Sequence, residues 1–365
     1  MKVICVVGAR PNFMKIAPLQ KAFMLHPEVD SIIVHTGQHY DEKMSEVFFQ
    51  QLNIPKPVYN LGIGGGSHTH QKAEVMIAFE KVLQAEQPDM VIVVGDVNAT
   101  TACSLTAVKM GIKVSHVEAG LRSHDRNMSE EINRLVTDCI SDYLFVTEQS
   151  AIDHLAMEGV DPKKVFYVGN LMIDNLINLL DRASDNPIKS RLNVSDQSYV
   201  LMTMHRPSNV DHALGLVSII NIIKLLCKKK TVIFSIHPRT RNNLIRFNLW
   251  QELESIDNLI LEEPLGYLEF LNLMQSAVAV VTDSGGIQEE TTYLKVPCIT
   301  FRDTTERPIT VAIGSNVLIK DLDPSQVYDT FKSILSRNWK ESEIPLYWDG
   351  KTAQRIVDII VGLIN

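Results

Sequence analysis

The chain has 365 residues, of which 45% are hydrophobic and 21% are charged, and its formal net charge at pH 7 is −8. This length exceeds one ordinary hydrophobic core, so we expect two domains. The negative charge argues against a nucleic-acid-binding protein and does not favour an acidic membrane surface. An anionic ligand therefore needs a local cluster of cations and backbone N–H groups.

The absence of targeting and disulfide signals predicts a cytoplasmic protein. The apolar run near the N-terminus is too short for a signal peptide, and no stretch approaches the roughly 18 uncharged apolar residues of a membrane helix. No CxxC spacing occurs, and we expect five reduced core cysteines, which are Cys5, Cys103, Cys139, Cys227 and Cys298. The histidines lack ligand partners at useful spacing, so no metal site is expected.

Short runs rich in β-branched residues alternate with helical patterns along the whole chain. The strands expected in the first half are Lys2–Val7, Ser31–Thr36, Met90–Val94, Lys113–His116, Tyr143–Val146 and Val165–Val168. Those expected in the second half are Val200–Met204, Thr231–Ile236, Leu259–Leu261, Ala277–Val281 and Val296–Phe301. This alternation predicts an α/β protein made of two doubly wound, Rossmann-like domains with parallel sheets.

A polar segment between Asp181 and Ser198, broken by Pro187, marks the predicted domain boundary. We expect an N-terminal domain over residues 1–185 and a C-terminal domain over residues 186–350. A last helix over residues 351–365 is a candidate to cross back to the first domain. Ligands of doubly wound sheets bind beyond the carboxyl ends of the strands, so we expect the active site in the interdomain cleft.

The stretch VVTDSGGIQEE predicts a strand, a turn and a helix start. The first N–H groups of a helix lack partners and, with the helix dipole, favour an anion. Gly285 and Gly286 allow a phosphate to approach the backbone, and Ser284 adds a hydroxyl. Glu289 or Glu290 suits the two hydroxyls of a ribose. An anion-binding turn followed by such a carboxylate indicates a nucleotide site. On these residues alone, an N-capped helix with an exposed acidic first turn fits equally well.

Basic residues follow several expected strands and supply candidate phosphate ligands. Arg10 and Lys15 flank the first turn, and His205 follows the first strand of the second half. The alternative for Arg10 and Lys15 is surface charge at a helix start. The motif GARPNF is neither GxGxxG nor a Walker loop, so no tightly bound NAD and no other cofactor is expected.

Three acidic positions are candidates for acid–base chemistry on two faces of a substrate. Asp96 and Glu118 end neighbouring strand patterns, and Glu130 and Glu131 together begin a helix. The alternatives are that Asp96 caps the next helix and that Glu130 and Glu131 only complement a helix N-terminus.

Seven motifs in order resemble the non-hydrolysing UDP-N-acetylglucosamine 2-epimerases, from Met1 to about Leu318. They are GARPNFMKIAPL, GDVNATTA, HVEAGLRS, EEINR, MHRPSNVD, TDSGGIQEE and FRDTTERP. The resemblance implies a GT-B-like fold, a homodimer, and interconversion of UDP-GlcNAc and UDP-ManNAc for surface polysaccharide biosynthesis. It also implies a mechanism in which UDP is eliminated to leave 2-acetamidoglucal and is then added back.

The resemblance assigns roles to individual residues. It implies that Asp96, Glu118 and Glu130 take part in catalysis, with Glu131 as the second choice for the third carboxylate. We place His205 with them. The resemblance implies that the remaining site residues bind the UDP-sugar. The diphosphate is expected to be held by Ser284, Gly285, Gly286, Arg10, His205 and Arg307, with Lys15 nearby. The ribose is expected to be held by Glu290, and the uracil to be contacted by Leu265 and Phe270.

One departure from the family pattern concerns the substrate. Many bacterial members carry Glu where this chain has Asn12, and the GARPxF form also occurs in relatives that act on modified sugars such as UDP-2,3-diacetamido-uronates. The alternatives are therefore a 2-epimerase of such a modified UDP-sugar and a GT-B glycosyltransferase. A hydrolysing epimerase and a non-catalytic UDP-sugar-binding protein rank lower, because the first differs in its first-turn motif and the second leaves the carboxylates without a role.

Overall fold

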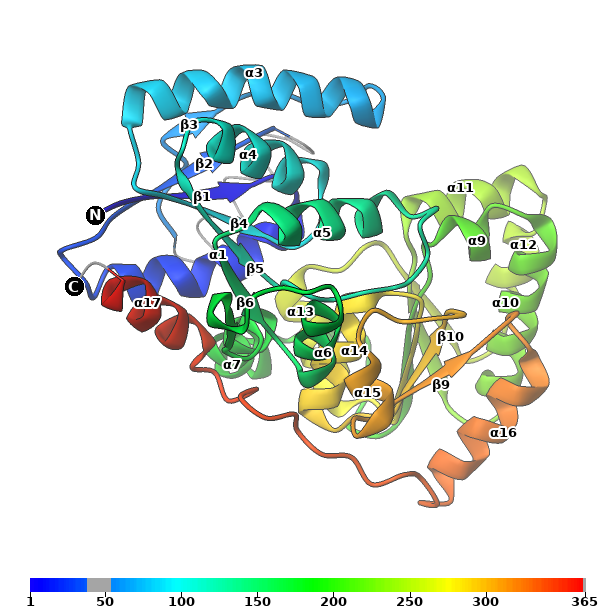
Figure 1. Ribbon diagram of the computed structural model, residues 1–365. Helices are drawn as coiled ribbons and strands as arrows, with labels where there is room; N and C mark the ends of the chain where they lie inside the picture. Colours follow the sequence, from blue (N-terminus) through cyan, green and yellow to red (C-terminus); the bar gives the residue numbers. More distant parts are fainter. Residues whose placement is uncertain (38–53, 364–365) are drawn as a thin grey trace. The chain divides into compact units, whose positions relative to one another are not determined.

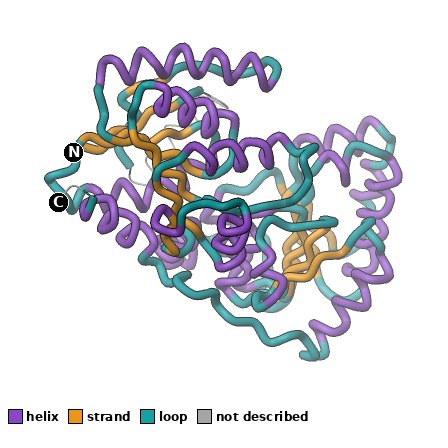
Figure 2. Tube along the Cα trace, in the orientation of Figure 1, coloured by secondary structure: helices purple, strands orange, loops and turns teal. Residues whose placement is uncertain are grey.

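The computed structural model describes residues 1–37 and 54–363, and the chain divides into two compact units (Figure 1). The first unit runs from Met1 to Asn175 and resumes at Leu346, and the second runs from Leu176 to Pro345. From the sequence we had expected the second domain to begin at residue 186 and the C-terminal helix that is a candidate to return to the first domain to begin at residue 351. Figure 2 shows the strands of each unit gathered in a layer with helices around it.

The first unit is built on a seven-stranded parallel sheet with the order β3-β2-β1-β4-β5-β6-β7. Its strands are β1 (Lys2–Val7), β2 (Asp30–His35), β3 (Tyr59–Asn60), β4 (Met90–Val94), β5 (Lys113–Val117), β6 (Tyr143–Val146) and β7 (Val165–Tyr167). All of β4 is buried, as is β1 after its first residue. Such continuous apolar runs are typical of parallel strands that helices cover on both faces.

Helices cover this sheet. They are α1 (Arg10–Phe23), α3 (His68–Glu86), α4 (Asn98–Lys109), α5 (Ser129–Ile140), α6 (Gln149–Met157) and α17 (Thr352–Gly362), with a short 3-10 helix at Pro162–Lys164. Helix α7 (Leu171–Ser184) begins in the first unit and continues into the second. Side chains of α3 and α4 share a core with Ile4 and Val6 of β1. Helix α17 lies along α1 (Figure 1), and the carboxylate of Asp174 accepts hydrogen bonds from the backbone N–H groups of Thr352 and Ala353 at its start.

The second unit has a six-stranded parallel sheet with the order β10-β9-β8-β11-β12-β13. Its strands are β8 (Tyr199–Thr203), β9 (Thr231–Ser235), β10 (Leu259–Glu262), β11 (Ala279–Thr282), β12 (Cys298–Phe301) and β13 (Asn316–Ile319). Its helices are α8 (Ile188–Arg191), α9 (Pro207–Val210), α10 (Ala213–Cys227), α11 (Pro238–Arg246), α12 (Trp250–Glu254), α13 (Tyr267–Ser276), α14 (Gly285–Leu294), α15 (Pro308–Ala312) and α16 (Pro324–Leu335). One core joins the sheet to α10 and α16.

The predicted fold class is confirmed, because both sheets are parallel and doubly wound. Every strand expected from the sequence is present with small shifts at its ends, and β3 and β13 are two further edge strands that were not expected. The prediction of five core cysteines is wrong for Cys139, which is exposed on α5, whereas the other four are buried. Within the described residues, no helix is long and apolar enough to cross a membrane.

Candidate active site

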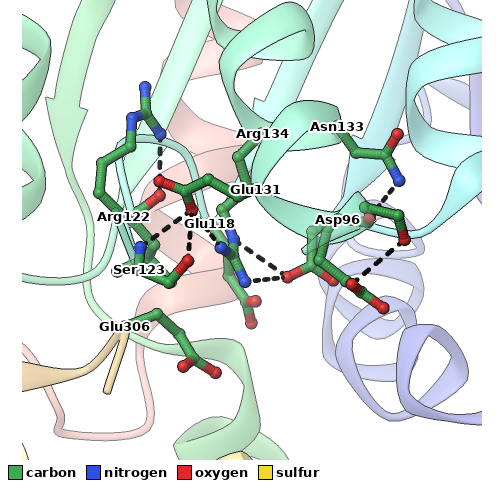
Figure 3. A network of polar contacts seen from close by, with 12 residues as sticks. Asp96, Glu118, Arg122, Ser123, Glu131, Asn133, Arg134 and Glu306 are labelled. Atoms are coloured by element: carbon green, nitrogen blue, oxygen red, sulfur yellow. Dashed lines mark hydrogen bonds and ion pairs between the residues drawn. The ribbon is translucent and has the colours of Figure 1, made fainter. Parts of the chain in front are cut away.

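Asp96 follows β4, and Arg134 of α5 holds its carboxylate. The Nε and Nη2 atoms of Arg134 lie 3.0 and 2.6 Å from Oδ2 of Asp96 (Figure 3). The side chain of Asp96 keeps 31% of its surface exposed. Helix α4 is capped by Val97 without a side-chain hydrogen bond, so the alternative role of Asp96 as a helix cap is wrong. The carboxylate is thus oriented by a cation and still reachable by a ligand.

Glu118 follows β5 and forms a buried ion pair with Lys15 of α1. The Nζ atom of Lys15 lies 2.6 Å from Oε2 of Glu118, and both side chains are more than nine-tenths buried. Strands β4 and β5 are neighbours, with Val94 opposite Val117. Asp96 and Glu118 therefore leave the sheet at the same edge, each paired with a cation from a helix.

The two adjacent glutamates at the start of α5 have different surroundings. Glu131 is buried and accepts hydrogen bonds from the N–H and hydroxyl of Ser123, from the N–H of His124, and from Arg134 at 2.6 Å. Burial raises the pKa of Glu131, but these hydrogen bonds outweigh it and lower the pKa below its usual value. Glu130 is exposed, and its carboxylate accepts a hydrogen bond from the Ser129 hydroxyl. Glu131 therefore anchors the segment before α5, and Glu130 is accessible to a ligand.

Two residues of the first turn complete this group. Arg10 begins α1, but its side chain lies outside what the structure describes. Asn12 is buried, its Oδ1 accepts from the N–H groups of Gly8 and Ala9, and its Nδ2 donates to the carbonyl of Val94. Because a glutamate side chain has no donor when ionised, Asn12 binds the end of β4 in a way that Glu cannot.

In the second unit, β11 leads into the N-terminus of α14. Ser284 is the N-cap, and its side chain makes no capping hydrogen bond within the described residues. A Cβ atom on Gly285 would lie 3.0 Å from Oε1 of Glu306, whereas nothing lies within 4 Å of one on Gly286. The backbone at Gly286 is thus open to a ligand at a helix start, where N–H groups and the helix dipole favour an anion.

A network of charged side chains surrounds this turn. Arg307 lies 2.5 Å from Glu289 and 2.9 Å from Glu306, and Arg302 lies 2.6 Å from Glu306. Burial raises the pKa of Glu306, but the charges of Arg307 and Arg302 outweigh this and hold the pKa well below its usual range. The Nη1 atom of Arg302 is buried without a hydrogen-bond partner among the described residues, and it lies 3.5 Å from a Cβ placed on Gly285.

Glu290 is buried one turn into α14, and the hydroxyl of Tyr267 donates a hydrogen bond of 2.8 Å to its Oε1. Burial raises the pKa of Glu290 to about 7, although the Tyr267 hydrogen bond opposes the shift. Glu289 is buried as well. The alternative of an exposed acidic first turn is therefore wrong, because both carboxylates point into the protein.

His205 follows β8 and is oriented by Asp283, the residue before the Ser284 cap. The Nδ1 atom of His205 lies 2.9 Å from Oδ1 of Asp283. The Asp283 carboxylate also accepts hydrogen bonds from the backbone N–H groups of His205 and Arg206. Burial raises the pKa of Asp283, but the hydrogen bond and charge of His205 outweigh it and lower the pKa. Because Nδ1 faces a carboxylate, it carries a proton, and Nε2 is the atom that can meet a ligand.

Leu265 and Phe270 lie around the start of α13, and both are half-buried. The N–H of Leu265 donates to the Ser235 hydroxyl at the end of β9, over 3.3 Å. Gly266, the N-cap of α13, lies between them in sequence. Leu265 and Phe270 therefore lie in the second unit, as does Glu290. Tyr267, the hydrogen-bond partner of Glu290, is the first residue of α13.

The described site residues form two groups, one in each unit. The first holds Lys15, Asp96, Glu118 and Glu130, and the second holds His205, Leu265, Phe270, Ser284, Gly285, Gly286, Glu290 and Arg307. The sequence analysis had not singled out Arg134, Asp283 or Tyr267. Arg134 and Asp283 lie inside the motifs EEINR and TDSGG, but Tyr267 offered no signal beyond its place at a helix start. Among residues 1–37 and 54–363, no cluster of His, Cys, Asp or Glu is arranged to hold a metal ion.

Known proteins resemble this chain over nearly all of its length. A family model described as UDP-N-acetylglucosamine 2-epimerase matches residues 21–361. The UDP-N-acetylglucosamine 2-epimerase of Methanocaldococcus jannaschii is 45% identical over 99% of both chains. The UDP-2,3-diacetamido-2,3-dideoxy-D-glucuronate 2-epimerase of Pseudomonas aeruginosa is 38% identical over 100% of both chains.

A solved structure shows the same likeness in three dimensions. The crystal structure of the M. jannaschii UDP-GlcNAc 2-epimerase in complex with UDP-GlcNAc and UDP superposes with a TM-score of 0.88 at 44% identity. The superposition covers 99% of this chain and 100% of that one.

Proposed function

We propose that this chain, which belongs to the UDP-N-acetylglucosamine 2-epimerase family, interconverts UDP-GlcNAc and UDP-ManNAc. The observation that carries the proposal is the pair of carboxylates at one edge of the first sheet. Asp96 and Glu118 follow neighbouring strands, and each is held within 2.6 Å of a cation. Two oriented carboxylates are what proton transfer on two faces of a sugar requires.

The chemistry explains why the enzyme needs groups that hold UDP. The proton on C2 of the sugar has no adjacent ring carbonyl, so its simple abstraction is unfavourable. Removal of that proton by a carboxylate while the C1–O bond breaks forms a C1=C2 double bond, and UDP leaves with the electron pair. The products of this half-reaction are 2-acetamidoglucal and UDP. Protonation of C2 from the opposite face and return of UDP to C1 invert the centre without oxidation.

The second unit has the groups that a leaving UDP needs. The open backbone at Gly286, the hydroxyl of Ser284 and the guanidinium of Arg307 suit a diphosphate. His205 presents Nε2 because Asp283 holds Nδ1. Glu290 suits the ribose hydroxyls, and Leu265 with Phe270 suits the uracil. Donors placed where negative charge develops stabilise the leaving group and so lower the barrier.

In the first unit, we assign acid–base roles to Asp96, Glu118 and Glu130. Lys15 keeps a positive charge beside Glu118, and Arg134 does the same for Asp96. The exposed carboxylate of Glu130 is the third acid–base group. Glu131, in contrast, anchors the backbone of Ser123 and His124. A homodimer, a cytoplasmic location and a role in surface polysaccharide synthesis stay predictions.

A modified UDP-sugar is the second candidate substrate. It is supported by the 38% identity to an epimerase named for UDP-2,3-diacetamido-2,3-dideoxy-D-glucuronate and by the GARPNF motif of the first turn. The buried amide of Asn12, which binds the end of β4, is compatible with either sugar. This candidate keeps the reaction and the site residues and changes only the sugar.

Product analysis from both directions tests the proposal. The purified chain is incubated with UDP-GlcNAc in one series and with UDP-ManNAc in another, and the nucleotide sugars are separated by liquid chromatography. We expect both series to reach the same mixture. Turnover of the diacetamido-uronate substrate with neither of these two would favour the second candidate. Release of UDP without a new nucleotide sugar would contradict both and favour a transferase or hydrolase.

A further inference from the structure

His116 lies in β5, two residues before Glu118, and is fully buried. Its Nδ1 atom lies 2.6 Å from Oδ1 of Asp138, and its Nε2 atom lies 2.8 Å from the carbonyl oxygen of Gly95. A carbonyl oxygen and a carboxylate oxygen can only accept hydrogen bonds. Each ring nitrogen of His116 therefore faces an oxygen acceptor, so the ring links Asp138 to the peptide that precedes Asp96.

Further contacts hold the carboxylate of Asp138 in place. Asp138 on α5 is buried, and its Oδ2 accepts from the N–H of Gly120 at 3.0 Å and lies 2.7 Å from Nη1 of Arg122. Burial raises the pKa of Asp138, but the charges and hydrogen bonds of His116 and Arg122 outweigh it and lower the pKa. Arg122 is also bound to Glu158, so the charges that face the ring form one closed network.

The two outer hydrogen bonds of the pair end on the backbone that carries the candidate catalytic carboxylates. His116 binds the carbonyl of Gly95, which is bonded directly to Asp96. Asp138 binds the N–H of Gly120, two residues after Glu118. We infer that the His116–Asp138 pair is a positioning device that fixes the peptides of Asp96 and Glu118 relative to each other. This inference rests on the proposed epimerase function.

The local backbone explains why such a device is needed. Gly95, Glu118 and Gly120 all have positive φ angles, of 70°, 69° and 77°. For Glu118, which has a Cβ atom, this left-handed conformation is strained and persists only when the surroundings enforce it. A Cβ on Gly120 would lie 2.5 Å from the carbonyl oxygen of Ala151, so this turn packs too closely for another residue. The two hydrogen bonds hold both irregular turns against the sheet.

Two substitutions of Asp138 separate positioning from charge. In Asp138→Asn, the amide oxygen can still accept from Gly120 and Arg122, and the amide group can still hydrogen-bond Nδ1 of His116, so the link to Gly95 is kept. In Asp138→Ala, the link is lost. We expect kcat to fall by about 100-fold in Asp138→Ala and by less than about tenfold in Asp138→Asn, with KM and UDP affinity nearly unchanged in both.

The matched control is Asp174→Ala. Asp174 is also buried and also accepts two backbone N–H groups, those of Thr352 and Ala353, but it contacts neither turn. Both alanine variants should lower the melting temperature, whereas only Asp138→Ala should lower the kcat of the folded protein. Equal effects of the two alanine variants on kcat would overturn the inference.

A measurement that needs no turnover completes the test. Hydrogen exchange of the Gly120 amide should accelerate about tenfold in Asp138→Ala and remain slow in Asp138→Asn and Asp174→Ala. Unchanged exchange in Asp138→Ala would refute the pair as a positioning device. Failure of the wild type to convert any UDP-sugar, with the exchange result as expected, would instead refute the proposed function.

Discussion

The ammonium group of Lys15 lies 2.6 Å from a carboxylate oxygen of Glu118, and both side chains are more than nine-tenths buried. The cost of removing these charges from water is recovered only while both are present. Lys15 was expected near the anion site, but its nearest described partner is a candidate catalytic carboxylate. We infer that Lys15 holds the side chain of Glu118 in place inside the protein.

Lys15→Met should therefore lower the free energy of unfolding by about 3 kcal/mol, because the buried carboxylate of Glu118 loses this cation. The double variant Lys15→Met/Glu118→Gln should recover at least half of that loss, since its two side chains are both neutral. Neither variant should epimerise. Urea unfolding of the four proteins of this cycle measures the coupling between the two residues. Additive effects on stability would contradict a buried ion pair.

Asp96→Asn and Glu118→Gln should each reduce turnover by at least about 100-fold while UDP binding remains, because most of the groups that suit UDP lie in the second unit. Calorimetric titration with UDP and a turnover assay on the same preparations separate the two effects. Near-normal rates in both variants would refute the assignment of these carboxylates.

Glu130→Gln and Glu131→Gln should differ in kind although the residues are adjacent. Glu130 is exposed, so its substitution should abolish turnover and leave the melting temperature unchanged. Glu131 accepts from two backbone N–H groups and Arg134, so an amide there would lose acceptors and cost about 1–3 kcal/mol of stability. Thermal unfolding and a turnover assay of both variants test this, and the reverse pattern would exchange their roles.

Acid should also reduce the contribution of Glu131 to the stability of the folded protein. Because its folded pKa is below the unfolded value of 4.5, its contribution to stability is present above that value and is lost as the pH falls through the folded pKa. Unfolding of wild type and Glu131→Gln at pH 7 and pH 4 should therefore show the difference between them shrinking in acid.

Glu290 predicts a pH dependence of nucleotide binding near neutrality. Its pKa is raised to about 7, chiefly by burial, and only the ionised carboxylate accepts hydrogen bonds from two ribose hydroxyls. The affinity for UDP should therefore fall about tenfold between pH 8 and pH 6, in proportion to the ionised fraction. Calorimetric titration with UDP at both pH values measures this. Glu290→Gln is the control, because UDP itself titrates, and an equal fall in that variant would contradict the role of Glu290.

The same group has the opposite effect on folding. Its folded pKa lies above the unfolded value of 4.5, so the stability it contributes is present below pH 4.5 and is lost as the pH rises through about 7. Glu290→Gln should gain stability relative to the wild type between pH 5 and pH 8, which denaturant unfolding at both values can measure.

The sequence predicted the sheets well because their central strands are buried and therefore nearly pure apolar runs. MVIVV and KVICVV needed no tertiary information to be recognised as β4 and β1. The edge strand β3 has two residues, and β13 is a short run beside a turn, so neither carried enough pattern. The predicted boundary after residue 185 was placed in a polar segment. The chain instead changes unit between Asn175 and Leu176, inside helix α7, where the helical pattern of the sequence continues without a break.

The site residues at strand ends were predictable because parallel strands deliver their carboxyl ends to one edge. The residues that orient them were not, because their roles depend on contacts between distant segments. Asp283 meets His205 across 78 residues, and Arg134 meets Asp96 across 38. The different burial of Glu130 and Glu131 likewise follows from the segment Ser123–His124, which folds back onto only one of the two adjacent side chains.

Proton NMR of the purified protein with UDP-GlcNAc in D₂O tests the proposed elimination and re-addition of UDP. We expect a new anomeric signal of UDP-ManNAc and the loss of coupling to the C2 proton, since every passage through 2-acetamidoglucal allows solvent deuterium to enter at C2. UDP-ManNAc formed with its C2 proton retained would contradict proton abstraction by exchangeable carboxylates.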